Sequence, residues 1–149
     1  MAYTYKLEAL LTFRTNLEEL AQQGLTREKK LLENHRKRLE ELKISRYLTI
    51  EEFERKKKSV LPAYMLLFYM ESIYNMDREI QGQQTMVESQ EKVVEQARQN
   101  LLDKVKDRKV IERAREKDYE NYLQRLRHEE QKEADEMAVL RYDKERVHL

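Results

Sequence analysis

The sequence predicts an all-α protein of two long helices in an antiparallel coiled-coil hairpin, with a short helix in the bend. Charged residues make up 40% of the 149 residues, whereas Gly occurs twice and Pro once. Such a shortage of turn formers is typical of long helices and coiled coils. The apolar residues also recur at helical spacing, which a disordered chain does not require. We therefore expect a single coiled-coil domain over residues 1–149.

The first helix is expected over residues 5–46. Its apolar residues are spaced mostly by three and four, which places them on one stripe of a helix. They are Leu7, Leu10, Leu11, Leu17, Leu20, Ala21, Leu25, Leu31, Leu32, Leu39 and Leu42.

A bend with a short helix inside it is expected over residues 47–62. Thr49 and Glu52 have the spacing of a capping box, in which the two side chains satisfy unpaired backbone N–H groups where a helix starts. Pro62 has no N–H and suits the first turn of the next helix.

The second long helix is expected over residues 63–145 and carries the clearest heptad pattern. Six apolar residues lie seven apart, and a second series fills the complementary coiled-coil positions. The first series is Leu66, Ile73, Ile80, Val87, Val94 and Leu101, and the second is Tyr69, Met76, Gln83, Gln90 and Ala97. Beyond Leu101 the apolar pattern predicts a shift of about one residue, as at a stutter, to Val105, Tyr119 and Leu126.

Matching the two seams predicts that Leu42 lies opposite Leu66 and Leu7 opposite Leu101. If the short helix in the bend extends the first arm instead, pairing reaches about residue 115 or 120. Either way, roughly the last 30 to 45 residues extend beyond the first helix and have no partner within the chain.

This overhang has an apolar side and a charged side in helical projection. Its apolar side carries Leu123, Leu126, Ala134, Met137, Ala138 and Arg141, and its charged side carries His128, Glu129, Lys132, Asp135 and Glu136. An apolar stripe that its own chain does not bury is typical of a protein-binding surface.

Other classes of function are disfavoured by composition. The net charge of +1 lacks the basic excess of a nucleic-acid-binding protein. The apolar run Val60–Met70 is too short to cross a bilayer, so we expect no direct membrane insertion and a soluble intracellular protein. His128 and Asp135 share a face but have no further His or Cys nearby, so no metal site is expected. A hairpin of two helices offers no cleft for catalytic carboxylates, so neither an enzyme nor a cofactor is expected.

Three stretches resemble the FliJ family of the flagellar type III export apparatus. They are LEALLTFRTNLEELAQ (residues 7–22), YMLLFYMESIYNMDREI (residues 64–80) and EEQKEADEMA (residues 129–138). The third is the most specific, because it is similar to the family's E-x-K-x-x-D-E-x-A ending.

The resemblance implies a protein similar to the rotor stalk of rotary ATPases. Such a protein binds and stimulates the hexameric export ATPase, contacts the cytoplasmic domain of the export gate and escorts export chaperones. It lies in the cytoplasm, peripheral to the inner membrane at the export apparatus. The resemblance seats the chain termini in the ATPase, with Leu123, Leu126, Lys132, Asp135, Glu136 and Met137 as contacts. The gate contact falls near the bend, at Tyr64, Phe68, Tyr69, Ile73 and Met76.

Three alternatives stay open. The residues near the bend could simply pack the bend. The same pattern fits the equivalent stalk of a virulence-type secretion system. It also fits a structural coiled-coil tether that associates through its heptads and has no link to an ATPase.

Overall fold

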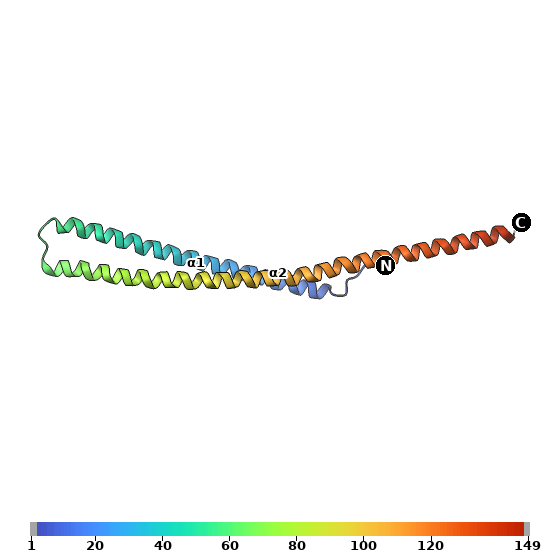
Figure 1. Cartoon of the computed structure of the whole chain (residues 1–149), viewed down its shortest axis with the longest axis horizontal. Helices are drawn as coiled ribbons and strands as arrows, with labels where there is room; N and C mark the ends of the chain where they lie inside the picture. Colours follow the sequence, from blue (N-terminus) through green and yellow to red (C-terminus); the bar gives the residue numbers. More distant parts are fainter. Residues whose placement is uncertain (1–2, 148–149) are drawn as a thin grey trace. The chain divides into compact units, whose positions relative to one another are not determined.

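The computed structural model describes residues 3–147, and within that range the protein is all-helical without strands. Two long helices, α1 (Glu8–Lys57) and α2 (Ala63–Val147), pack against each other and are joined by residues 58–62 (Figure 1). The prediction of an all-α protein with two long paired helices is therefore confirmed.

The helix ends follow from local chemistry. α1 ends in Arg55, Lys56 and Lys57, whose positive charges suit the negative end of the helix dipole. α2 begins directly after Pro62, whose carbonyl oxygen accepts hydrogen bonds from the backbone nitrogens of Met65 and Leu66 at 3.1 and 3.2 Å. The predicted start of the second helix at residue 63 agrees with this.

The predicted break over residues 47–62 is wrong, because α1 continues to Lys57 without interruption. Thr49 does not cap a helix: its hydroxyl donates to the Ser45 carbonyl oxygen one turn earlier, at 2.9 Å. The Glu52 carboxylate accepts a hydrogen bond from the Tyr69 hydroxyl of α2 at 3.1 Å. Both side chains have other partners, so the capping-box spacing does not mark a helix start here.

The contacts within the chain group it into two units, and we describe each by itself. Unit 2 comprises Glu19–Asp103, and unit 1 comprises Met1–Glu18 with Lys104–Leu149.

Unit 2 contains the apolar seam. Leu25 and Leu32 of α1 are buried against Val87 and Val94 of α2. Leu39, Ala97 and Leu101 pack against this core. The heptad positions predicted for these residues are confirmed. By contrast Leu20 and Leu31 of the first predicted stripe, and Leu66 of the predicted heptad series in α2, are exposed.

The register of unit 2 differs from the simpler prediction. Arg46 forms an ion pair with Asp77, and the Phe53 ring stacks on Tyr69 with the ring centres 5.1 Å apart. Leu42 precedes Arg46 in α1 and therefore lies opposite residues beyond Asp77, so its predicted pairing with Leu66 is wrong. The helices are offset by about one and a half heptads because α1 does not stop at residue 46.

Unit 1 pairs the start of α1 with residues 104–122 of α2. Tyr5 and Leu11 are buried against Ile111. Glu8 forms an ion pair with Arg115 at 3.2 Å, and the Tyr3 hydroxyl donates to Asp118 at 2.9 Å. Pairing therefore reaches the region of residues 115 to 120, as the longer of the two sequence alternatives predicted.

The predicted stutter after Leu101 is wrong. Of the three residues predicted for the shifted series, Val105 is half-buried, but Tyr119 and Leu126 are exposed. Arg108 is half-buried and Ile111 is buried. Arg108 continues the first seven-residue series of α2 and Ile111 the second, without a shift. The apolar pattern misled the prediction because a charged residue, Arg108, occupies the seam and pairs with Glu18 of α1.

No helix within residues 3–147 combines the length and the apolar character needed to span a membrane.

Candidate interaction sites

The first candidate surface is the C-terminal segment, which we define as residues 124–147 of α2. Every side chain in it is exposed. It lacks Pro and Gly and is rich in strong helix formers, which favours the helical conformation without tertiary packing. A hydrogen bond of 3.1 Å from Gln131 to Asp135 links successive turns.

The structure places the residues predicted for the ATPase contact on or beside this segment. Leu126 and Met137 are 38% and 55% exposed. Lys132, Asp135 and Glu136 are exposed as well, and Leu123 is half-buried at the base of the segment. The sequence analysis missed further exposed apolar residues. Two of them, Leu140 and Val147, lie two and three heptads after Leu126 and could have been predicted from that spacing. The missed residues are Val139, Leu140, Tyr142 and Val147.

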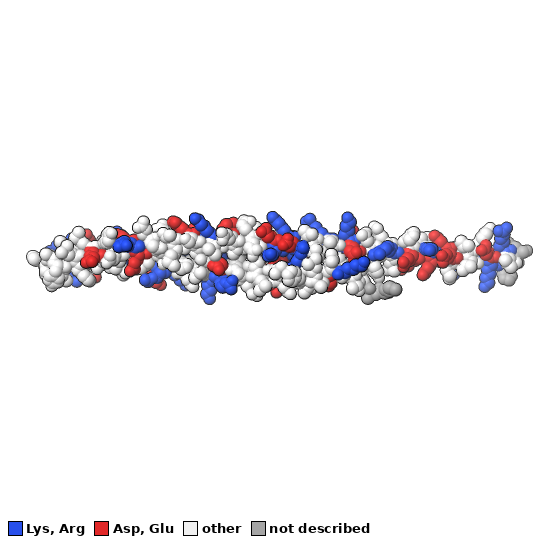
Figure 2. Space-filling model, turned by 90° about the horizontal axis from the view of Figure 1, so that it is seen from below, with Lys and Arg blue, Asp and Glu red and all other residues white. Residues whose placement is uncertain are grey.

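The charge of the C-terminal segment is uneven. Five carboxylates lie within residues 129–136, opposed by Lys132 alone. Figure 2 shows Asp and Glu residues, in red, gathered on the C-terminal part of α2. Among residues 3–147 no three His, Cys, Asp or Glu side chains converge to hold a metal ion. The cluster is therefore an acidic surface beside an apolar one, without the geometry of a metal centre.

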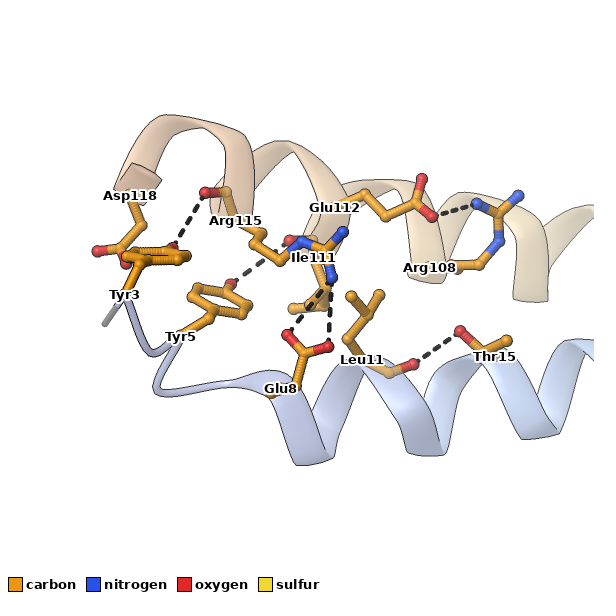
Figure 3. Close-up of polar contacts among 10 residues, drawn as sticks. All are labelled: Tyr3, Tyr5, Glu8, Leu11, Thr15, Arg108, Ile111, Glu112, Arg115 and Asp118. Carbon is orange, nitrogen blue, oxygen red and sulfur yellow. Dashed lines mark hydrogen bonds and ion pairs between the residues drawn. The ribbon is translucent and has the colours of Figure 1, made fainter. Parts of the chain in front are cut away.

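The base of the C-terminal segment carries an aromatic cluster that the sequence did not reveal. The Tyr3 ring lies edge-on to Tyr119, with ring centres 4.9 Å apart, and 5.2 Å from the ring centre of Tyr122. Partial burial, together with the hydrogen bond to Asp118, raises the pKa of Tyr3 to about 12. Figure 3 shows how Tyr3, Tyr5 and Glu8 reach across to α2. α1 begins at Glu8 and not at residue 5 as predicted, so Tyr3 and Tyr5 precede it and no helical periodicity indicated them.

The second candidate surface lies near the bend, in unit 2. Tyr64 and Phe68 are 72% and 64% exposed, as a contact surface requires. Ile73 and Met76 are half-buried. We define the bend surface by its exposed large apolar residues on α2, which are Tyr64, Leu66, Leu67, Phe68, Met70 and Tyr74.

Tyr69 belongs to the packing of the bend. It is only 6% exposed and stacks on Phe53, with the Lys56 ammonium 5.4 Å from its ring centre. The hydrogen bonds that Lys56 donates to Tyr69 and Glu52 raise the pKa of Lys56, and the bonds that Glu52 accepts from Lys56 and Tyr69 lower the pKa of Glu52. For Tyr69, the alternative that it packs the bend is therefore the one that agrees with the structure.

The two helices run in opposite directions and pack along heptad seams, which places the protein in the class of antiparallel coiled-coil proteins. Two of its apolar faces are exposed. Within this class the family is shown by its sequence. The model of the flagellar FliJ protein family matches residues 3–146, and the chain belongs to this family. It is therefore a coiled-coil protein associated with type III export, in a family of non-enzymatic accessory proteins.

A solved structure shares the fold. It is that of a putative YscO homologue from Chlamydia trachomatis, with a TM-score of 0.59 and 19% sequence identity. The similarity covers 95% of this chain and 96% of that one. No curated protein matches the sequence.

Proposed function

We propose that this protein is a stalk-like component of the flagellar type III export apparatus that binds and stimulates the hexameric export ATPase. The observation that carries the proposal is the C-terminal segment, a helix with every side chain exposed and an apolar stripe left unburied. Membership of the FliJ family supports the assignment to the type III export apparatus.

The chemistry of the segment supports a protein partner. Leu126, Met137 and Leu140 expose apolar area whose removal from water is favourable by about 25 cal/mol per Å². The flanking carboxylates suit a basic rim around an apolar contact, because opposite charges steer association and fix orientation. We assign the contact to Leu123, Leu126, Lys132, Asp135, Glu136 and Met137.

We assign the cytoplasmic domain of the export gate to the bend surface, since Tyr64 and Phe68 present large aromatic area there. Ile73 and Met76 border it. Escort of export chaperones completes the role that we propose, at the cytoplasmic side of the inner membrane.

Truncation before Leu123 tests the ATPase contact. We expect the melting temperature and the helical content per residue to stay nearly unchanged, because the removed side chains are almost all exposed. Stimulation of the hexameric export ATPase should be lost. A truncated chain that still stimulates the ATPase would show that the contact lies elsewhere.

Two point variants test which part of the segment binds. Met137→Asp should weaken binding by about tenfold or more, because it places a charge on the apolar contact. Asp135→Ala should have a smaller effect, since exposed ion pairs are typically worth less than about 1 kcal/mol. A binding titration of both variants, with unchanged circular dichroism as the control for folding, distinguishes them. The reverse order of effects would contradict an apolar contact.

The fold shared with the YscO homologue keeps a virulence-type secretion stalk as a second candidate. The two functions are distinguished by which export ATPase the purified chain stimulates. A coiled-coil tether would stimulate neither and would instead associate with itself as concentration rises.

A further inference from the structure

Two glutamines interrupt the apolar seam of unit 2. Gln90 is 8% exposed and Gln83 is half-buried, although the heptad neighbours on either side of them are aliphatic. Those neighbours are Ile80, Val87 and Val94. Placing an amide where an aliphatic side chain would fit costs free energy, because the amide loses its hydration. The glutamines are therefore not explained by stability alone.

Each glutamine makes the same kind of contact with α1. The Gln90 side-chain nitrogen donates to the Glu28 backbone oxygen at 3.0 Å and to the Glu28 carboxylate at 2.6 Å. The Gln83 side-chain nitrogen donates to the His35 backbone oxygen at 3.0 Å and lies 3.3 Å from His35 Nδ1. The seam thus holds two polar layers, seven residues apart on both helices.

The apolar layers alone do not define the register. Both helices repeat aliphatic residues every seven positions, so sliding one helix by a heptad brings aliphatic residues opposite each other again. The bend would have to move by only three or four residues, about half a heptad, to allow this.

The polar layers do define the register. A slip of one heptad keeps a single side-chain pair, either Gln83 with Glu28 or Gln90 with His35. The other glutamine would face Ala21 or Leu42, which offer a backbone oxygen but no polar side chain. The slipped register therefore loses a side-chain hydrogen bond in the seam. Only the observed register gives both glutamines a polar side-chain partner.

We propose that Gln83 and Gln90, through Glu28 and His35, fix the register of α1 against α2. These residues position one helix along the other, because the register decides which residues of α2 lie against α1. This inference rests on the contacts of unit 2 and holds whatever partner the protein binds.

Spin labels on introduced cysteines measure the register directly, because the chain has no cysteine of its own. The exposed residues Lys43 of α1 and Lys92 of α2 carry the labels, as the pair Lys43→Cys with Lys92→Cys. The two labels are offset along the helices, because Gln90 lies against Glu28. A slip of one heptad moves one helix about 10 Å along the other and so lengthens or shortens the separation of the labels, which pulsed electron paramagnetic resonance measures.

The labelled pair is placed in three backgrounds: the parent chain, Gln83→Leu/Gln90→Leu, and the control Gln81→Leu/Gln84→Leu. The control adds the same side chains at exposed positions. The parent and the control should show the same single separation between the labels. In Gln83→Leu/Gln90→Leu, a second population should appear whose separation differs by several ångström.

The melting temperature completes the test. We expect Gln83→Leu/Gln90→Leu to keep its helical circular dichroism and to melt no lower than the parent, because leucine restores apolar layers. If this variant shows only the label separation of the parent, the glutamines do not set the register and the proposal is wrong. If the variant loses its helical structure, the glutamines are needed for folding itself, and the proposal is equally wrong.

Discussion

At the scale of single residues, neighbours of the same type have different roles. Val94 is 6% exposed and belongs to the core of unit 2, whereas Val93 beside it is 39% exposed. The heptad position therefore decides what a valine contributes.

The two valines give a matched prediction. Val94→Asp should lower the free energy of unfolding by about 2–4 kcal/mol, because it buries a carboxylate without a partner. Val93→Asp should lower it by less than about 1 kcal/mol, since that carboxylate stays in water. Urea unfolding of both variants measures the difference, and equal losses would mean that the seam is misassigned.

Tyr3 gives a prediction about pH. Its pKa is raised to about 12, above the ordinary value of 10, because burial against the neighbouring rings and the hydrogen bond to Asp118 favour the neutral hydroxyl. The contact therefore contributes its full stabilisation below pH 10 and loses it as pH rises through 12. The absorbance difference between the parent and Tyr3→Phe should titrate near pH 12. Titration at the ordinary value would show that the hydroxyl is not held by Asp118.

At the scale of elements, α1 shows both what the sequence could predict and where it misled. Thr49 and Glu52 have the spacing of a capping box, and this local pattern predicted a break. The heptad steps from Leu39 to Arg46 and Phe53 continue through this stretch, but Arg46 is charged, and Thr49 at the complementary position is polar. A prediction that followed the heptad positions, whether apolar or not, would have extended the first helix to Lys57. Tertiary pairing overrides the local pattern here.

Thr49 distinguishes the two interpretations by experiment. Loss of a helix cap typically costs about 1 kcal/mol. Within a helix, Thr49→Ala should instead raise stability by a few tenths of a kcal/mol, because alanine has the higher helix propensity. Thermal unfolding checks the sign. Thr26→Ala is the matched control, since the Thr26 hydroxyl also donates to the backbone oxygen one turn earlier.

The register could not be predicted from the apolar pattern, for a physical reason. A seven-residue repeat matches itself at every heptad, so Leu42 opposite Leu66 satisfied the pattern as well as the observed pairing does. The exposed C-terminal segment was predictable, because it follows from the unequal lengths of the two arms. The aromatic cluster around Tyr3 was not, since it joins residues far apart in sequence outside any repeat.

At the scale of the whole molecule, the two units differ in what holds their helices together. Unit 2 has the larger apolar core, around Leu32 and Val87, and its helices are also joined by the ion pairs of Arg36 with Glu91 and Arg46 with Asp77. Unit 1 has a smaller core at Leu11 and Ile111, together with ion pairs such as that between Glu8 and Arg115. Ionic and apolar contacts respond to salt in opposite ways, because salt screens charges and strengthens apolar burial.

Salt should therefore affect the units differently. Raising the ionic strength from about 0.1 to 1 M shortens the Debye length from about 10 to 3 Å. Hydrogen exchange of backbone amides in residues 8–18 should accelerate, while exchange in residues 25–42 should stay constant or slow. Mass spectrometry of the exchanged peptides measures both regions in one sample. The same response in both would mean that the ion pairs of unit 1 do not hold it together.

The exposed C-terminal segment has a thermodynamic consequence. A helix without tertiary contacts obeys the nucleation and elongation equilibrium of a free peptide, so its helical fraction depends on its own sequence. A partner that recognises the helix binds with an apparent dissociation constant divided by that fraction. Ala134→Gly costs about 1 kcal/mol of helix stability. The affinity for the partner is then set partly by residues that do not contact it. Substitutions that change only the helical fraction of this stretch of α2 can therefore tune that affinity.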